Sequence, residues 1–428
     1  MKKLNIAIVG LGNIGSYLYK YLKTNKKILS KKNNCIPNII YISARKKSKK
    51  RSFKISNKIW LKNYLDATKS KKVDLIVELI GGAEGPAKKL VFNALKNKKH
   101  VVTANKALIA KYGDQLSKIA ETNKVNLEFE ASVCGGVPII RSLKEGLIAN
   151  KIKKVYGIFN GTSNYILSSM DNENKNFIDV LKRAKKLGYA ESNPSSDLNG
   201  EDVAAKLKIL TSLCFNSFLN NNIHVEGIKT IDKEDIDNAN KLGYKIKLLG
   251  FAESIKGKIY QRVHPTLIKK SSYVASIDGV LNAVIVDGYP VGQSIIQGEG
   301  AGPTATTSAL ISDISSIMRG NIKFPFSISN NERKSNKFNS ILERSFSAYL
   351  RFEVKDKPGV LSNITQVFSK NNVSIKRLIQ NPNKSRKSSS IVIISHDSKD
   401  KSLRKIIKII NKKKYVLKKS KLIRIDDN

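Results

Sequence analysis

Two charged residues one helical turn apart are the first candidates for chemistry in this chain of 428 residues. Asp202 and Lys206 stand at positions i and i+4 of a stretch with helical periodicity, so both side chains lie on one face of the expected helix. A lysine ammonium held by a carboxylate can donate a proton to a carbonyl oxygen and take it back in the reverse direction. The same spacing is also typical of a surface salt bridge, and spacing alone leaves both interpretations open.

Three further polar segments could contribute to a site around this pair. Lys106 ends the sequence Thr-Ala-Asn-Lys, which follows a predicted strand, and it could meet a substrate carboxylate or a developing alkoxide. Residues 160–164 form a glycine-containing polar turn suited to hydrogen bonds with a substrate. Glu191 and Asp197 lie in an acidic loop of an otherwise basic chain. Each segment can also be interpreted as an ordinary solvated loop.

The first predicted strand, 4–9, ends in a glycine-rich fingerprint, and a helical stretch over 16–22 follows it. The fingerprint G-x-G-x-x-G consists of Gly10, Leu11, Gly12, Asn13, Ile14 and Gly15. The first glycine makes the tight turn, the second lets the backbone approach a pyrophosphate, and the third permits close packing of helix on strand. The helix N-terminus then offers free N–H groups to phosphates. This context favours a dinucleotide site over a plain structural turn.

The end of the second predicted strand, 38–43, bears on the choice of cofactor. NAD sites place an Asp or Glu there for the ribose hydroxyl, but this strand runs into Ala44 and Arg45 without a carboxylate. A guanidinium at this place can pair with a 2′-phosphate. The sequence therefore favours NADP, with NAD still possible. Alternatively, Arg45 belongs to a lysine-rich loop without a ligand.

Strand and helix patterns divide the chain into three predicted domains. Residues 1–137 together with 303–320 are expected to form an α/β domain of the Rossmann type. Residues 138–302 form an α+β domain, 321–346 a polar linker, and 347–428 a βαββαβ, ferredoxin-like unit. The remaining predicted strands are 75–79, 100–103, 126–129, 260–265, 283–287, 348–354, 373–380, 389–395 and 416–425. The remaining predicted helices are 199–215, 304–319, one from Val360 and one from Lys401.

The composition excludes several classes of protein. The formal net charge is +44, but the basic residues are spread along the chain and form no stripe with interleaved aromatics, which argues against a specific nucleic-acid site. No apolar run reaches the roughly eighteen residues of a membrane helix, and the N-terminal apolar stretch lacks a cleavage site. Three distant cysteines indicate neither a disulfide framework nor a metal site. We expect a cytoplasmic protein.

Several short motifs follow one another along the first three quarters of the chain. After the fingerprint come T-A-N-K-A-L (103–108), G-T-S-N-Y-I-L (161–167), G-Y-A-E (188–191), D-L-N-G-E-D-V-A-A-K-L (197–207) and G-E-G-A-G-P (298–303). In these motifs and in their order the chain resembles the homoserine dehydrogenase family, from its start to about Gly320. One departure is Asn193, where the family commonly has an aspartate, so the acidic loop has one carboxylate fewer.

The resemblance implies a reaction and a role for each candidate residue. Aspartate 4-semialdehyde and a reduced nicotinamide would give homoserine reversibly, in the branch that leads to threonine, methionine and isoleucine. Lys206 would be the acid and base, Asp202 would hold it, and Lys106 would lie beside both nicotinamide and substrate. Glu191 would bind the substrate ammonium, with Asp197 in support. Gly302 would join the fingerprint in holding the cofactor.

A glycine-rich loop resembles the segment in which this family holds a monovalent cation. By resemblance, a cation, sodium in the first place, would be bound by the main-chain carbonyls of Val133, Gly135 and Val137, with Glu130 nearby. Oxygen-only ligation suits a hard cation. The alternative is an ordinary turn that joins two domains.

The C-terminal unit resembles an ACT domain, a module that binds amino acids between paired copies. The resemblance rests on D-K-P-G-V-L (356–361) and on the βαββαβ pattern. It implies threonine as effector, feedback inhibition, contacts near Gly359, Val360 and Leu361, and at least a homodimer. The alternative is a dimerisation module without a ligand. Because the chain opens directly on the dinucleotide fingerprint, the monofunctional form of the enzyme is expected.

Other functions remain as alternatives to this dehydrogenase. A different Rossmann reductase of an amino-acid-derived aldehyde or imine would not need the Asp202–Lys206 pair or the Glu191 loop. A basic nucleic-acid-binding protein would need a localised basic face. A sensor without catalysis would not need to keep Lys106.

Overall fold

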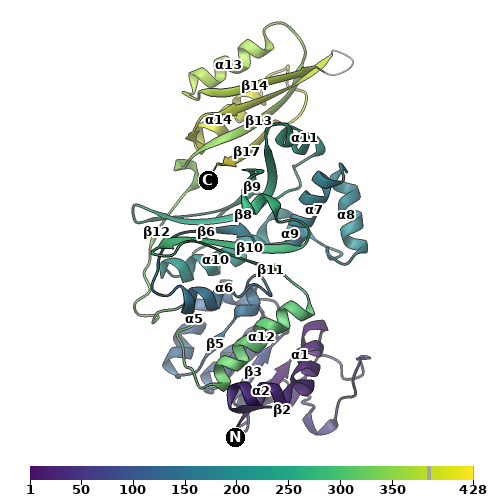
Figure 1. The fold of residues 1–428 in the computed structure, drawn as a ribbon, viewed down its shortest axis with the longest axis vertical. Coiled ribbons are helices and arrows are strands. Elements are labelled where there is room, and N and C mark those ends of the chain that lie inside the picture. Colours follow the sequence, from purple (N-terminus) through teal and green to yellow (C-terminus); the bar gives the residue numbers. More distant parts are fainter. Residues whose placement is uncertain (383–386, 428) are drawn as a thin grey trace.

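The N-terminal part of the computed structural model, which describes residues 1–382 and 387–427, is built on a parallel sheet of five strands (Figure 1). In spatial order these are β2 (Cys35–Ser43), β1 (Lys2–Val9), β3 (Leu75–Glu78), β4 (His100–Thr103) and β5 (Leu127–Glu128). All four neighbouring pairs run parallel. The predicted Rossmann-type sheet is confirmed, although β2 begins three residues earlier than the sequence pattern indicates.

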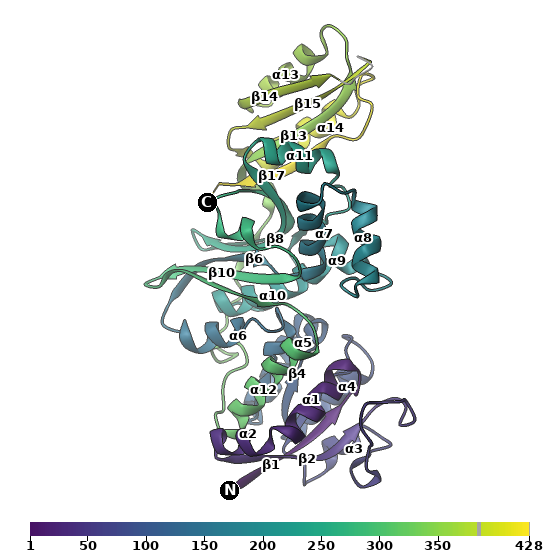
Figure 2. The same ribbon diagram turned by 45° about the vertical axis from the view of Figure 1, so that its right-hand side comes forward.

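Helices cover this sheet, and one of them comes from far along the chain. Figure 2 shows α12 beside α1, and Leu310 and Ile314 share a buried core with Leu18. Because α1 begins at Asn13, not at Ser16 as predicted, its free N–H groups directly follow Gly12. The helices are α1 (Asn13–Thr24), α2 (Lys26–Asn33), α3 (Asp66–Lys69), α4 (Pro86–Lys96), α5 (Lys106–Thr122) and α12 (Pro303–Met318).

The middle part is an antiparallel sheet with helices packed on it. Its strands, in spatial order, are β11 (Gly292–Glu299), β10 (Leu281–Tyr289), β6 (Lys151–Ile158), β8 (Tyr244–Ile255) and β9 (Lys258–Lys269). Its helices are α6 (Ile139–Arg141), α7 (Gly161–Asn172), α8 (Phe177–Lys186), α9 (Ser195–Asn199), α10 (Glu201–Phe215) and α11 (Lys233–Lys241). Sequence analysis missed β6, β8 and β11.

The single helix predicted over 199–215 is wrong at its start. Gly200 adopts φ +85°, a left-handed conformation that ends α9 and lets α10 begin in a new direction. Leu207 and Leu210 on α10 are fully buried and belong to the same core as Leu248 of β8. The break therefore places the first turn of α10 at the site while its apolar face packs on the sheet.

The C-terminal unit has the predicted βαββαβ order. Its elements are β13 (Ser345–Lys355), α13 (Val360–Lys370), β14 (Ile375–Pro382), β15 (Ser388–Ser395), α14 (Asp400–Ile410) and β17 (Lys421–Asp426). The last strand is shorter than predicted, because residues 411–420 form a turn in which the Asn411 side chain accepts the Ser420 N–H. Val416 makes only an isolated bridge to Val354.

The middle sheet continues into the C-terminal unit. β17 runs parallel to β9, with Arg424 opposite Thr266, and antiparallel to β13 on its other side. The segment predicted as a linker contributes too, since β12 (Lys337–Asn339) pairs with β9 and the buried Arg333 binds Asp114 at 2.6 Å. Hydrogen bonds thus join the two parts edge to edge. Nowhere in 1–382 or 387–427 is there a helix with the length and apolar character to span a membrane.

Candidate active site

The predicted acid–base pair, Asp202 and Lys206, lies at the junction of the first two parts of the molecule. A second lysine, Lys106, binds the same carboxylate. The carboxylate of Asp202 lies 2.8 Å from the Nζ of Lys206 and 2.6 Å from the Nζ of Lys106. Lys206 and Asp202 come from the first turns of α10, whereas Lys106 is the first residue of α5. One buried carboxylate therefore holds two ammonium groups, which a surface salt bridge would not do.

Lys206 is deeply buried, with 8% of its surface exposed. Its Nζ donates to the Phe159 carbonyl oxygen at 2.6 Å as well as to Asp202. Burial opposes its charge, but Asp202 outweighs burial and raises the pKa of Lys206. The pKa of Asp202 is lowered, since Lys206 and Lys106 outweigh its own burial. The pair is therefore ionised at neutral pH, and Lys206 is available as a proton donor.

Asn160 organises the carboxylates, a role that sequence analysis missed although it noted the turn 160–164. Its side-chain amide donates to Asp197 at 2.8 Å and to Asp202 at 2.9 Å, while its carbonyl accepts the Ser163 N–H and caps α7. Burial raises the pKa of Asp197. An asparagine N-cap followed by a glycine is a common turn, so the pattern by itself did not distinguish a site residue.

A buried network explains why Lys106 points at Asp202. Glu78, at the end of β3, accepts the Thr103 hydroxyl at 2.5 Å, and the Thr103 oxygen accepts the Asn105 N–H. The Asn105 side chain in turn caps α5 by accepting the Leu108 N–H. These bonds set the first turn of α5, and with it the backbone of Lys106, at the carboxyl edge of the parallel sheet.

The Glu191 side chain lies outside this cluster. It is exposed in the loop between α8 and α9. The loop is tied to the site, since the Thr162 hydroxyl donates to the Tyr189 carbonyl at 2.7 Å. Its role in binding the substrate ammonium stays a prediction.

The fingerprint glycines form a close-packed turn. Gly10 has φ +107°, and a Cβ atom there would lie 2.3 Å from the Leu79 carbonyl oxygen. A Cβ atom on Gly15 would lie 1.9 Å from the Gly10 oxygen. Gly12, the N-cap of α1, faces open space and carries no side chain to cap the helix. The N–H groups of Asn13 and Ile14 are thus accessible to a phosphate, and the turn fits a dinucleotide.

A cavity of about 590 Å³ extends from this turn along the end of β2. Arg45, Lys46 and Lys49 line it, and none of the described residues that line it is acidic. Arg51 shapes the basic loop by donating to the carbonyls of Lys46, Lys47 and Lys49 at 3.0–3.1 Å. Nothing in the lysine-rich sequence singled out Arg51.

The remaining predicted cofactor contact is Gly302, the N-cap of α12 with φ +109°. The next residue, Pro303, lines a second cavity together with Gly12 and Asn13. The loop before α12 therefore lies beside the start of α1, where a pyrophosphate would sit.

Of the residues predicted to hold a cation, the main-chain carbonyls fit that role and Glu130 does not. Both carboxylate oxygens of Glu130 accept backbone N–H groups, from Ile140 at 2.9 Å and Arg141 at 2.6 Å, and burial raises the pKa of Glu130 to about 7. The Val137 carbonyl accepts the Ile139 N–H at 2.8 Å but has a second lone pair. The carbonyls of the loop could therefore bind a cation, whereas both oxygens of the Glu130 carboxylate already accept backbone N–H groups. Sodium stays a prediction.

Comparison with known proteins assigns the chain to a family. Residues 10–130 match the homoserine dehydrogenase NAD-binding domain, 138–315 the homoserine dehydrogenase family and 348–414 the ACT domain. A homoserine dehydrogenase of Neisseria gonorrhoeae is 38% identical over 433 residues, with 100% of this chain and 99% of that protein covered. This chain belongs to the homoserine dehydrogenase family.

Other homoserine dehydrogenases agree with this assignment. One of Bacillus subtilis is 35% identical, with 100% of this chain and 99% of that protein covered. The crystal structure of one from Thiobacillus denitrificans has a TM-score of 0.93 and 35% identity, covering 100% of this chain and 99% of that one. A hyperthermophilic archaeal homoserine dehydrogenase in complex with NADPH has a TM-score of 0.63 and 25% identity, covering 75% and 99%. The predicted class of enzyme, an oxidoreductase with an NAD-binding and an ACT domain, is confirmed.

Proposed function

We propose that this chain catalyses the reversible NAD(P)H-dependent reduction of L-aspartate 4-semialdehyde to L-homoserine, in the branch that leads to threonine, methionine and isoleucine. The observation that carries the proposal is the buried carboxylate of Asp202, which holds the buried Lys206 and the partly exposed Lys106 in a member of this family. It puts a protonated amine at the carboxyl edge of the parallel sheet, where ligands of such folds bind.

Each side chain then has a defined task. A bound reduced nicotinamide supplies the hydride for the aldehyde carbon. Lys206 donates a proton to the aldehyde oxygen and takes it back in the reverse direction. Lys106, which is partly exposed, stabilises negative charge on that oxygen, and Asp202 positions both lysines. Glu191 receives the substrate ammonium, and Asp197 keeps the neighbouring surface acidic.

The direct test follows NADPH absorbance at 340 nm with L-aspartate 4-semialdehyde. The proposal requires NADPH to be consumed in proportion to the semialdehyde, with homoserine as the product detected by mass spectrometry. Binding of NADPH without any turnover would overturn it and would favour a sensor that has lost catalysis.

The pH dependence of an Asp202→Asn variant tests the role of the carboxylate. In the native chain Asp202 raises the pKa of Lys206 against its burial. Without the carboxylate, burial dominates and lowers that pKa, so the ammonium is lost at a lower pH. We expect kcat for reduction to fall on the alkaline side at a lower pH than in the native chain. Asn160→Ala, which leaves the carboxylate in place, is the comparison. An alkaline limb that does not move in Asp202→Asn would contradict this role.

We further infer that NADPH is preferred over NADH. The support is the basic, acid-free lining of the cavity at the end of β2. Arg45→Asp places a carboxylate there, and we expect the Kd for NADPH to rise about tenfold or more, while that for NADH stays level or falls. Lys54→Asp, the same charge change at an exposed residue outside the lining, is the matched control. Fluorescence titration measures the Kd for NADPH and the Kd for NADH. Equal losses of NADPH affinity in the two variants would show that the effect comes from the overall charge of the chain and not from the position of Arg45.

We also infer feedback inhibition through the ACT domain, with L-threonine as the first candidate, and assembly at least as a homodimer. The support is the turn at Gly359, whose φ of +83° leads directly into α13 at Val360. The free backbone N–H groups in the first turn of α13, including that of Leu361, could bind an amino acid.

A further inference from the structure

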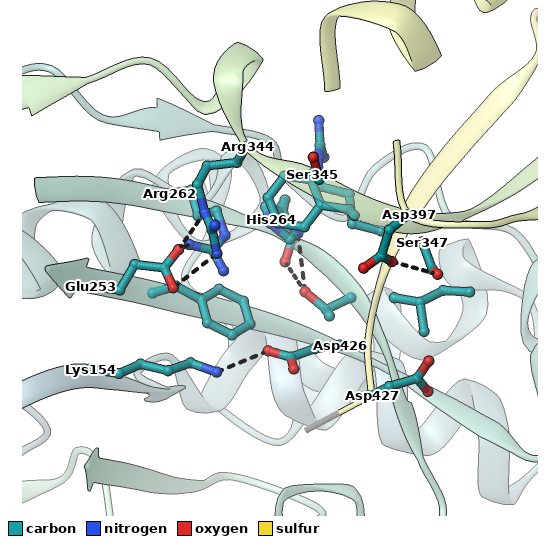
Figure 3. A pocket seen from close by; sticks show the side chains of 15 residues that line it. Lys154, Glu253, Arg262, His264, Arg344, Ser345, Ser347, Asp397, Asp426 and Asp427 are labelled. Atoms are coloured by element: carbon teal, nitrogen blue, oxygen red, sulfur yellow. Dashed lines mark hydrogen bonds and ion pairs between the residues drawn. The ribbon is translucent and has the colours of Figure 1, made fainter. Parts of the chain in front are cut away.

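Another cavity lies where the middle sheet meets the ACT domain, far from the dinucleotide turn and the two cavities beside it. It has a volume of about 210 Å³ and is bordered by β9, β17 and the start of β13 (Figure 3). For comparison, an engineered apolar cavity of about 150 Å³ takes up benzene. The space is therefore large enough for a molecule of the size of a small amino acid.

Two buried polar atoms in its lining have no partner among the described residues. One is the Nε of Arg262, a donor, and the other is the Nε2 of His264. Their residues are 4% and 1% exposed, and they stand two positions apart on β9, so they lie on one face of the strand. A buried polar atom without a partner costs free energy, so this pair indicates a ligand that brings an acceptor and a donor.

The tautomer of His264 decides what its free nitrogen can bind. Nδ1 lies 3.0 Å from the Pro265 carbonyl oxygen, which can only accept, and 3.0 Å from the Thr266 hydroxyl, which donates to the His264 carbonyl oxygen. These partners favour a ring proton on Nδ1, which leaves Nε2 as an acceptor. Burial, with Arg424 and Arg262 nearby, lowers the pKa of His264 well below its ordinary value, so the ring is neutral. A neutral acceptor of this kind suits an ammonium or a hydroxyl group.

The charged side chains around the cavity are balanced in number, and several of them are paired with one another. Four are basic and four are acidic. Figure 3 shows Arg262 and Arg344, which share the carboxylate of Glu253, on one side of His264, and Asp397 and Asp427 on the other. Lys154 and Asp426 bind each other at 3.3 Å. A lining with zero net charge, in which Asp397 and Asp427 lie apart from Arg262 and Arg344, disfavours a simple anion or cation. It matches a molecule that carries both charges.

We propose that this cavity binds a small neutral α-amino acid, with its carboxylate at the Nε of Arg262 and its ammonium between the Nε2 of His264 and the acidic side. This site is distinct from the loop at Gly359, which lies at the other end of β13.

The cavity is also connected to α9, the helix that carries Asp197. Arg424, which lines it, donates to Glu226 at 2.8 Å. Two residues on, the Ile228 N–H donates to the carbonyl of Leu198 at 2.9 Å, next to Asp197 and close to the Gly200 break. An effect of the bound amino acid on turnover would rest on the proposed function, whereas binding itself does not.

Isothermal titration calorimetry on the full chain tests the proposal. The probes are glycine, L-alanine, L-serine, L-threonine and L-valine, with L-lactate and ethanolamine as analogues that lack the ammonium or the carboxylate. Arg262→Lys keeps the charge that faces Glu253 but removes the Nε donor. His264→Phe removes the acceptor but keeps the stacking on Phe251. Leu361→Ala perturbs the other candidate site, and thermal unfolding shows that each variant is folded.

The expected result is binding of at least one probe, with neither analogue bound comparably. Arg262→Lys and His264→Phe should each weaken binding about tenfold or more, because each loses a hydrogen bond to a charged group, and Leu361→Ala should not. If only Leu361→Ala weakens binding, the amino acid lies in the ACT loop and the proposal fails. It also fails if no probe binds, since the cavity then holds only water. Turnover of the semialdehyde without added amino acid is measured separately. Failure of the proposed amino-acid site can then be distinguished from failure of the proposed dehydrogenase activity.

Discussion

Replacing Lys206 with methionine is expected to lower kcat for semialdehyde reduction by about 10²–10⁴-fold. The reaction needs a proton on the oxygen as the hydride reaches the carbon, and Lys206 is the buried ammonium in the site, held by Asp202 and the Phe159 carbonyl. Methionine keeps the length and the apolar stem, so the loss reports the missing proton donor. Initial rates at 340 nm measure it.

Two controls separate this effect from a loss of fold or of cofactor. Lys208→Met makes the same change two residues along α10, where the side chain binds Asn221 at the surface, and should leave kcat within a few-fold. NADPH binding by Lys206→Met, followed by fluorescence, should match the native chain. A variant that retains more than a tenth of native kcat would show that Lys106 or a water molecule supplies the proton instead.

Replacing Arg351 with methionine is expected to lower the free energy of unfolding by about 3–5 kcal/mol, the range for breaking a buried ion pair. This guanidinium of the ACT domain binds three carboxylates at the start of α11: Asp235 at 2.7 Å, Asp232 at 2.5 Å, and Glu234. Its side chain is 5% exposed and that of Asp235 is fully buried. Removing the cation leaves negative charge at a buried boundary between two parts of the chain.

Urea denaturation followed by circular dichroism measures this loss, with the first transition as the readout, because a chain of several domains need not unfold in one step. Arg377→Met, an exposed arginine on β14 of the same domain, is the matched control and should change stability by less than about 1 kcal/mol. Equal effects of the two changes would mean that the three carboxylates are well solvated without Arg351.

Local sequence determined the elements that carry the chemistry. The fingerprint from Gly10 to Gly15 predicts its turn because close packing excludes a side chain at its first and last glycines, where a Cβ atom would lie 2.3 Å and 1.9 Å from a carbonyl oxygen. The i,i+4 spacing of Asp202 and Lys206 follows from helical geometry and is present in α10. The βαββαβ order of the ACT domain is likewise readable from period and turn residues. In all three cases the information lies within a few neighbouring residues.

Tertiary structure alone decided how these elements meet. Asp202 binds Lys106 as well as Lys206 because α5 packs against α10. The pairing of β17 with β9 likewise joins strands that are far apart in the chain. The break at Gly200 was missed because a helical pattern continues across it, and only the contacts of α9 and α10 require the turn. Periodicity tells which face of an element is buried, but not which partner buries it, because many partners offer an equally apolar face.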